Sequence, residues 1–143
     1  MVAWVAVTEV PLDSGSIRQA LLDPGAGAVV LFEGCARDSH EGRAVELLAY
    51  ESFVPMAVAE LQRIRTEAMA QFGLIGCAIQ HRLGPVPLLE AAVVVGCASG
   101  HRREAFAAAA WIMDRIKERV PIWKREHYRD GARTWVEGPD RRD

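Results

Sequence analysis

The chain has 143 residues, of which 50% are hydrophobic and 25% are charged. These proportions are those of an ordinary globular domain, and a chain of about 150 residues buries enough surface to fold without disulfides or a structural metal. Seventeen Lys and Arg residues against nineteen Asp and Glu residues leave a formal net charge of −2, which argues against nucleic-acid binding through general attraction to phosphate.

Strand and helix signals alternate in the first third of the chain. Residues 2–10 carry β-branched and aromatic side chains and predict a strand; a short helix is expected near residues 16–22, and residues 27–33 predict a second strand. The polar, turn-forming residues 35–43 predict an exposed loop, and such loops carry function more often than cores do. Residues 44–51 predict a third strand.

A long helix is predicted next. Pro55 suits its first turn, and Gly73 follows Phe72 at the place where a left-handed residue ends a helix. The apolar stripe expected on this helix includes Met56, Ala59, Ile64 and Ala68.

Two further strands are predicted at residues 75–83 and 90–98, separated by a proline-containing connection at residues 84–87. A second long helix is expected over residues 101–119. It must end before Pro121, because the residue that precedes a proline is pushed out of the helical region.

Asp130 and Gly131, a pair preferred in tight hairpin turns, separate strand signals at residues 122–129 and 132–137. Strands are thus often adjacent in the sequence, which favours an α+β fold over a doubly wound sheet. We expect a largely antiparallel sheet, two long helices and a C-terminal β-hairpin. The sequence contains neither a G-x-G-x-x-G motif nor a P-loop, so it does not support the standard nucleotide-binding cradles.

No repeat or linker divides the sequence, so we expect one domain over residues 1–143, with the charged residues 138–143 as a frayed tail. The longest apolar stretches, such as residues 91–98, fall short of the roughly 20 residues that cross a bilayer, and the chain does not open on a basic region followed by an apolar run. We therefore expect no membrane association and a cytoplasmic location.

The cysteines and histidines give little sign of a metal site. Cys77 and Cys97 lie in apolar runs and are expected to be buried, whereas Cys35 lies beside Arg37 in a polar turn, where it is either a reactive thiol or an ordinary surface residue. No C-x-x-C or H-x-x-x-H spacing exists, so we expect no disulfide framework and no bound metal. The histidines to which we assign no chemistry are His40 and His127, expected to be exposed, and His81, within a strand.

One face of the second long helix carries Phe106, Ala110, Met113, Lys117 and Val120, at spacings of four and three residues. A lysine on an apolar stripe either packs its stem and extends its ammonium group to water, or lines a pocket with that group. Both interpretations of Lys117 stay open on the sequence alone.

Lys124 follows Pro121 and Trp123, which would hold the returning chain in a defined path. It is a candidate to share a site with Lys117. The alternative is that Lys124 and Arg125 line the solvated edge of a strand, since lysines commonly protect strand edges.

The start of the same helix has the composition of an anion site. His101 and Arg102 follow small residues at a helix N-terminus, where cations are disfavoured unless an anion balances them. The alternative is that these side chains simply face water. Sixteen residues at about 1.5 Å each separate His101 from Lys117 by about 24 Å. If both residues serve one site, a second copy must supply one of them, which predicts a two-fold dimer with composite pockets.

Taken together, these motifs resemble those of the large, catalytic subunits of molybdopterin synthases. The resemblance spans nearly the whole chain. The matching segments are FEGCARD at residues 32–38 with Glu41-Gly42, Tyr50-Glu51 before Pro55-Met56-Ala57, HRLG at 81–84, SGHR at 99–102 with Ala105-Phe106, and KERVPIWKRE at 117–126.

The resemblance implies a fold of the α/β-hammerhead type and a cytoplasmic sulfurtransferase of molybdenum-cofactor biosynthesis. Its substrate would be cyclic pyranopterin monophosphate, which receives two sulfurs as a dithiolene, and no permanently bound cofactor is implied. The partner would be a small ubiquitin-like subunit that ends in a Gly-Gly thiocarboxylate and inserts its tail into the pocket. Two large subunits would form the centre of a heterotetramer.

The resemblance also implies roles for individual residues. Lys117 and Lys124 match the two active-site lysines, and Arg37 matches the pocket arginine. His101 and Arg102 match the anion-binding pair that the neighbouring large subunit contributes. Phe32 and Met113 would form apolar walls of the substrate pocket. The alternative is that both residues belong only to the core.

Two departures from the family pattern stand out. Leu89 takes the place of a glycine that many relatives have before the acidic residue, so a different turn is expected there, and Cys35-Ala36 replaces the more usual pair beside Arg37.

Two other functions remain as alternatives: a non-catalytic module that binds a phosphorylated ligand or a ubiquitin-like tail, and a structural dimer with a solvated basic face. The presence of both lysines favours the enzyme.

Overall fold

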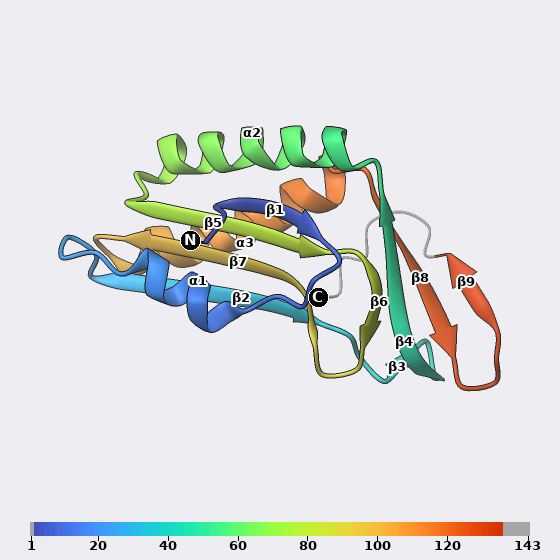
Figure 1. Cartoon of the computed structure of the whole chain (residues 1–143). Coiled ribbons are helices and arrows are strands. Elements are labelled where there is room, and N and C mark those ends of the chain that lie inside the picture. Colours follow the sequence, from blue (N-terminus) through green and yellow to red (C-terminus); the bar gives the residue numbers. More distant parts are fainter. Residues whose placement is uncertain (1, 136–143) are drawn as a thin grey trace.

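The computed structural model describes residues 2–135 and shows two sheets (Figure 1). The first has the strand order β1-β5-β7-β2, in which β1 and β5 are parallel and the other neighbours are antiparallel. Its strands are β1 (Val5–Thr8), β5 (Gly76–Arg82), β7 (Ala91–Ser99) and β2 (Ala28–Cys35).

The second sheet has the order β3-β4-β8-β9, and β6 also pairs with β4. All of its pairings are antiparallel. Its strands are β3 (Ser39–His40), β4 (Arg43–Ser52), β8 (Ile122–Tyr128), β9 (Arg133–Trp135) and β6 (Gly84–Pro87). The α+β prediction, with a largely antiparallel sheet and a C-terminal hairpin, is confirmed.

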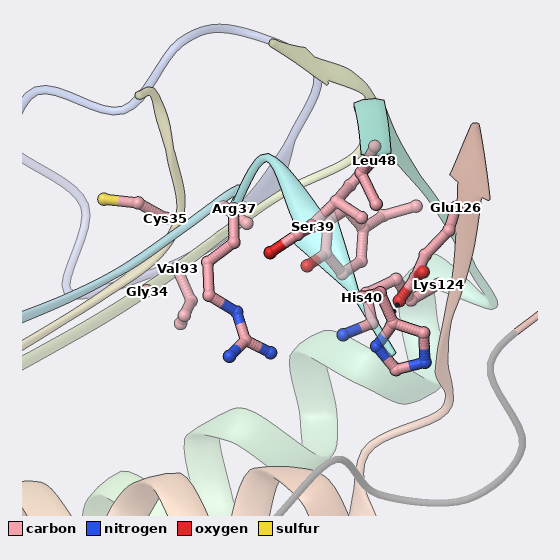
Figure 2. A pocket seen from close by; sticks show the side chains of 12 residues that line it. Gly34, Cys35, Arg37, Ser39, His40, Leu48, Val93, Lys124 and Glu126 are labelled. Carbon is pink, nitrogen blue, oxygen red and sulfur yellow. Dashed lines mark ion pairs between the residues drawn. The ribbon is translucent and has the colours of Figure 1, made fainter. Parts of the chain in front are cut away.

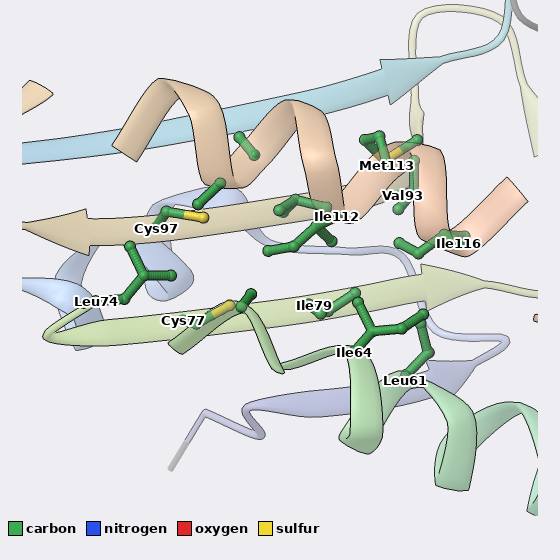
Figure 3. Packing of buried hydrophobic residues seen from close by; sticks show 14 of the residues in the cluster. Leu61, Ile64, Leu74, Cys77, Ile79, Val93, Cys97, Ile112, Met113 and Ile116 are labelled. Carbon is green, nitrogen blue, oxygen red and sulfur yellow. The ribbon is translucent and has the colours of Figure 1, made fainter. Parts of the chain in front are cut away.

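Three helices cover the first sheet: α1 (Ser14–Leu21), α2 (Val54–Phe72) and α3 (Arg102–Arg119). Helices α2 and α3 pack together on one face, as the side chains in Figure 3 show, and α1 packs on the other face. Strand β7 therefore has apolar neighbours on both faces, which explains why its sequence is an unbroken apolar run. Within residues 2–135, no helix is both long enough and apolar enough to cross a lipid bilayer.

The ends of α2 follow the signals expected from the sequence. Proline occupies the first turn, and Gly73 ends the helix with φ 61°, its N–H bonding the carbonyl of Met69. The expected stripe is only partly right, because Met56 is 63% exposed. The side chains of α2 that are buried in the core are Ala57, Leu61, Ile64 and Ala68.

Helix α3 ends before Pro121 as expected, but its buried face is rotated relative to the predicted stripe. Phe106 is 62% exposed and Ala110 is exposed, whereas Met113 and Val120 are buried. Small side chains let α3 approach the sheet and α2 closely, so they define the buried face in place of the bulkiest residue. The buried residues of α3 are Ala105, Ala108, Ala109, Ile112, Met113 and Ile116.

The connection expected at residues 84–87 is itself the strand β6, paired with β4. Prolines are tolerated there because an edge strand leaves some N–H positions without a ladder partner. The loop expected over residues 35–43 likewise contains the two-residue strand β3. The first strand is shorter than residues 2–10, and the tail expected at residues 138–143 lies outside the described residues.

The turn from β6 to β7 contains a leucine in the left-handed conformation. Leu89 has φ 74° and is 91% exposed, and the N–H of Glu90 bonds the carbonyl of Pro87 across the turn. A turn of this kind favours glycine at its third position, because a side chain there is strained. The backbone thus takes a conformation that glycine adopts freely, although leucine is present.

We expect Leu89→Gly to raise the free energy of unfolding by about 0.5–1 kcal/mol. Relief of left-handed strain gains about 1–2 kcal/mol, and the greater freedom of glycine in the unfolded chain offsets about half of it. Urea titration measures the change. Leu88→Gly is the matched control: Leu88 packs on a buried cluster, so this variant should be less stable than the wild type. A destabilised Leu89→Gly protein would contradict the expectation.

Candidate functional site

A small pocket lies where the two sheets meet (Figure 2). It is formed by the end of β2, the segment after it, and strands β4, β7 and β8. Its cavity volume is about 40 Å³, which is room for only a few water molecules. The residues that line it are Gly34, Cys35, Arg37, Ser39, His40, Val45, Leu48, Tyr50, Ala92, Val93, Lys124 and Glu126.

The end of β2 positions Arg37 at the pocket. The β2–β7 register shifts between Gly34 and Cys35, so the strand is irregular just before Arg37. A side chain at Gly34 would come within 2.8 Å of the side chain of Val93, so glycine permits the close approach of the strands. The chain then leaves the first sheet for β3, with Arg37 at the mouth of the pocket.

Lys124 reaches the same pocket from β8. It pairs in register with Tyr50 of β4, and Figure 2 shows its side chain and that of Arg37 extending into the same space. Strand β9 pairs with the other side of β8 at the three residues that follow Lys124, residues 125–127. Lys124 is half-buried and lines the pocket, which favours a place in the site over a solvated edge position. Arg37 and Lys124 are thus brought together from distant parts of the sequence.

Lys117 lies in the last turn of α3 and is half-buried. It does not line the pocket, although α3 leads directly into the strand that carries Lys124. A cation in the last turn interacts favourably with the helix dipole.

His101 and Arg102 lie at the opposite end of α3 from Lys117. His101 is the N-cap residue, and both side chains are exposed. The N–H of His101 bonds the hydroxyl of Ser99 at 3.4 Å. The length of the helix thus keeps this pair away from Lys117 within one chain, as the residue count predicts.

Phe32 and Met113 belong to the core rather than to the pocket of the single chain. Met113 is 9% exposed, and Phe32 is half-buried against the same cluster. Neither residue lines the pocket.

Glu126 and His40 are two polar residues of the pocket that were not predicted from the sequence. Glu126 is only 2% exposed, and His40, expected to be exposed, has a side chain only 16% exposed that faces Glu126. Glu126 follows Lys124 by two residues on the same face of β8, so the alternation of the strand was the signal that places it. His127, also expected to be exposed, is half-buried. Nothing in the local sequence indicates the contact from His40.

His81 packs against Tyr50 and is buried. The two rings are 5.0 Å apart in an edge-on arrangement, and burial lowers the pKa of His81 to about 4. The imidazole therefore stays neutral at physiological pH and adds no charge beside the pocket. Within residues 2–135, no group of His, Cys, Asp or Glu side chains is arranged to hold a metal ion.

The three cysteines differ in exposure. Cys77 and Cys97 are fully buried, as expected, and Cys35 is exposed. Burial of part of its side chain and the charge of Glu33 raise the pKa of Cys35, so its thiol is less acidic than that of a free cysteine. This argues against the reactive-thiol interpretation.

We expect iodoacetamide at pH 7 to modify Cys35 more slowly than a cysteine in an unstructured peptide, because the raised pKa leaves less thiolate. Cys77 and Cys97 should react only after unfolding. Intact-mass spectrometry over time, with and without urea, measures both effects. Modification of Cys35 faster than the peptide would contradict the raised pKa.

Comparison with known proteins identifies the family. A family model described as MoaE protein matches residues 7–119. The chain belongs to the MoaE protein family. The matched span includes the proposed site residues other than Lys124, which lies beyond its end.

Individual relatives extend the likeness. A protein of Aspergillus fumigatus named molybdopterin synthase catalytic subunit is 48% identical over 118 residues, which are 82% of this chain and 63% of that protein. A protein of Pyrococcus abyssi with the same name is 46% identical over 78% of this chain and 75% of its own length. The chain thus spans less than two thirds of the Aspergillus fumigatus relative.

A solved structure shares the fold of this chain. The crystal structure of molybdopterin synthase from Staphylococcus aureus contains a chain that superposes with a TM-score of 0.89 at 32% identity, over 95% of this chain and 98% of that one.

Proposed function

We propose that this MoaE-family chain is the catalytic subunit of a molybdopterin synthase. It would transfer sulfur from the thiocarboxylated C-terminus of a small ubiquitin-like subunit to cyclic pyranopterin monophosphate, giving the dithiolene of molybdopterin. The observation that carries the proposal is the convergence of Arg37 and Lys124 on one pocket, in a chain of this family. The relatives' name, catalytic subunit, supports the presence of a second kind of subunit.

The charges of the site suit an anionic substrate and an acyl-transfer step. Arg37 supplies a planar guanidinium group that binds phosphate with two parallel hydrogen bonds. Lys117 would polarise the acyl group of the thiocarboxylate or transfer protons, and Lys124 would assist proton transfer or hold the pterin. Phe32 and Met113 would supply apolar walls once the complex is assembled.

The size of the pocket supports a composite site. A cavity of about 40 Å³ does not enclose a pterin phosphate together with a peptide tail. His101 and Arg102 are exposed at the far end of α3, where a neighbouring copy can receive them. We therefore propose a homodimer of this chain at the centre of a heterotetramer, with the pterin as a substrate and no permanently bound cofactor. The proposed location is the cytoplasm, consistent with three free cysteines.

The test is an assay with purified protein, cyclic pyranopterin monophosphate and a thiocarboxylated small subunit, in which molybdopterin is measured. Product should form only when all three components are present. A small subunit with an ordinary carboxylate at its C-terminus is the matched control, because it can bind and has no sulfur to give. If the thiocarboxylated partner binds and no product forms, the non-catalytic binding module becomes the better interpretation.

A further inference from the structure

A buried carboxylate lies at the side of the pocket. Glu126 is 2% exposed, and both of its oxygens have partners. Oε2 accepts a hydrogen bond of 2.9 Å from the hydroxyl of Tyr128. Oε1 lies 3.3 Å from Nδ1 of His40, and Figure 2 shows these two side chains facing each other. A carboxylate removed from water is stable only when such donors surround it, so each contact has a substantial effect.

The two partners come from different parts of the fold. Tyr128 lies on β8 with Glu126. Burial, together with the hydrogen bond to Glu126, raises the pKa of Tyr128, so its hydroxyl stays protonated and donates that hydrogen bond. His40 lies on β3, three residues after Arg37. The contact between His40 and Glu126 therefore connects the segment that carries Arg37 to the strand that carries Lys124.

Backbone hydrogen bonds join this segment to β4. Strand β3 has two residues and pairs only at its Ser39 and His40 positions with β4. One further backbone bond, from the N–H of Val45 to the carbonyl of Asp38 at 2.8 Å, closes the hairpin. These bonds join the segment to β4, and the contact of the His40 side chain with Glu126 joins it to β8.

We propose that His40 is a positioning residue: through its contact with Glu126 it holds the segment of Arg37 in place against Lys124. The inference rests on the proposed function, in which Arg37 binds the substrate phosphate. His40 acts through Glu126, so the imidazole itself is not required to touch the substrate. Any side chain that places a donor near the Nδ1 position should serve.

The test compares three variants in complex with the small subunit. His40→Ala removes the donor. His40→Asn keeps a donor, because the side-chain amide nitrogen of asparagine is separated from Cα by the same number of bonds as Nδ1 of histidine. Glu41→Gln is the matched control: Glu41 is exposed and lies 3.7 Å from the other nitrogen of the same ring, so it removes a neighbouring charge and leaves the buried contact.

We expect His40→Ala to raise KM for the pterin about tenfold with kcat changed less than about threefold, the effect of losing one hydrogen bond to a charged group. His40→Asn and Glu41→Gln should remain within about threefold of the wild type in both constants. Unchanged kinetics in His40→Ala would overturn the inference. So would His40→Asn as defective as His40→Ala, because the imidazole itself would then be needed.

Hydrogen exchange gives a readout that does not depend on activity. Backbone amides in residues 37–45 should exchange faster in His40→Ala than in the wild type, and His40→Asn should restore their protection. If the wild type makes no product, the proposed function fails, and exchange still decides the positioning role. Equal exchange in the wild type and His40→Ala would overturn that role whatever the assay shows.

Discussion

Replacement of Lys117 by alanine should reduce molybdopterin formation by about 10²- to 10³-fold while the complex with the small subunit stays intact. Removing one preorganised group that stabilises developing charge at an acyl centre has an effect of this size in other enzymes. Lys117 is half-buried in the last turn of α3, so truncation of its side chain should leave the helix folded. Product formation per folded complex is the measured quantity, and size-exclusion chromatography measures the complex.

The matched control lies on the same helix. Arg115 pairs with Glu118 at 2.9 Å, and both side chains are partly exposed, so Arg115→Ala removes a cation of α3 at little cost in stability. It should retain activity close to that of the wild type. If Lys117→Ala instead lost the complex and kept normal turnover in whatever complex remained, the lysine would serve binding rather than chemistry.

Local signals predicted much of the fold. Pro55 and Gly73 set the limits of α2, and Gly131 adopts φ 89° in the expected hairpin turn, because each position depends only on its own backbone conformation. Strand β6 was missed because its pairing partner, β4, is distant in the sequence. The buried face of α3 was misplaced because counting hydrophobic residues favours Phe106, whereas close packing favours the small alanines.

Less of the candidate site than of the fold could be predicted from the sequence. Helix length alone separates His101 from Lys117, and the structure agrees. Lys124 was ambiguous from the residues, because only the packing of β8 against the other strands of the pocket shows that its side chain lines the pocket. The contact of His40 with Glu126 joins two strands that are far apart in the sequence. The residues around either one give no sign of the other, so the contact could not be predicted from local sequence.

A mixed dimer should recover activity that neither parent has. One parent carries Lys117→Ala, and the other carries alanine at both His101 and Arg102. If each site combines Lys117 of one copy with the His101 pair of the other, the mixed dimer contains one fully intact site and one doubly defective site. We expect such dimers, isolated with two different affinity tags, to show about half of the wild-type activity per dimer.

The control pairs two variants whose defects belong to the same half of the site. A mixed dimer of Lys117→Ala with Lys124→Ala chains should stay inactive, because Lys117 and Lys124 come from one copy and every site then lacks a lysine. Activity in this control, or none in the first mixed dimer, would show that the site is not shared as proposed. The distance along α3 makes the outcome decisive: an 18-residue helix cannot bring both of its ends to one small substrate, so a site that uses both must take them from two chains.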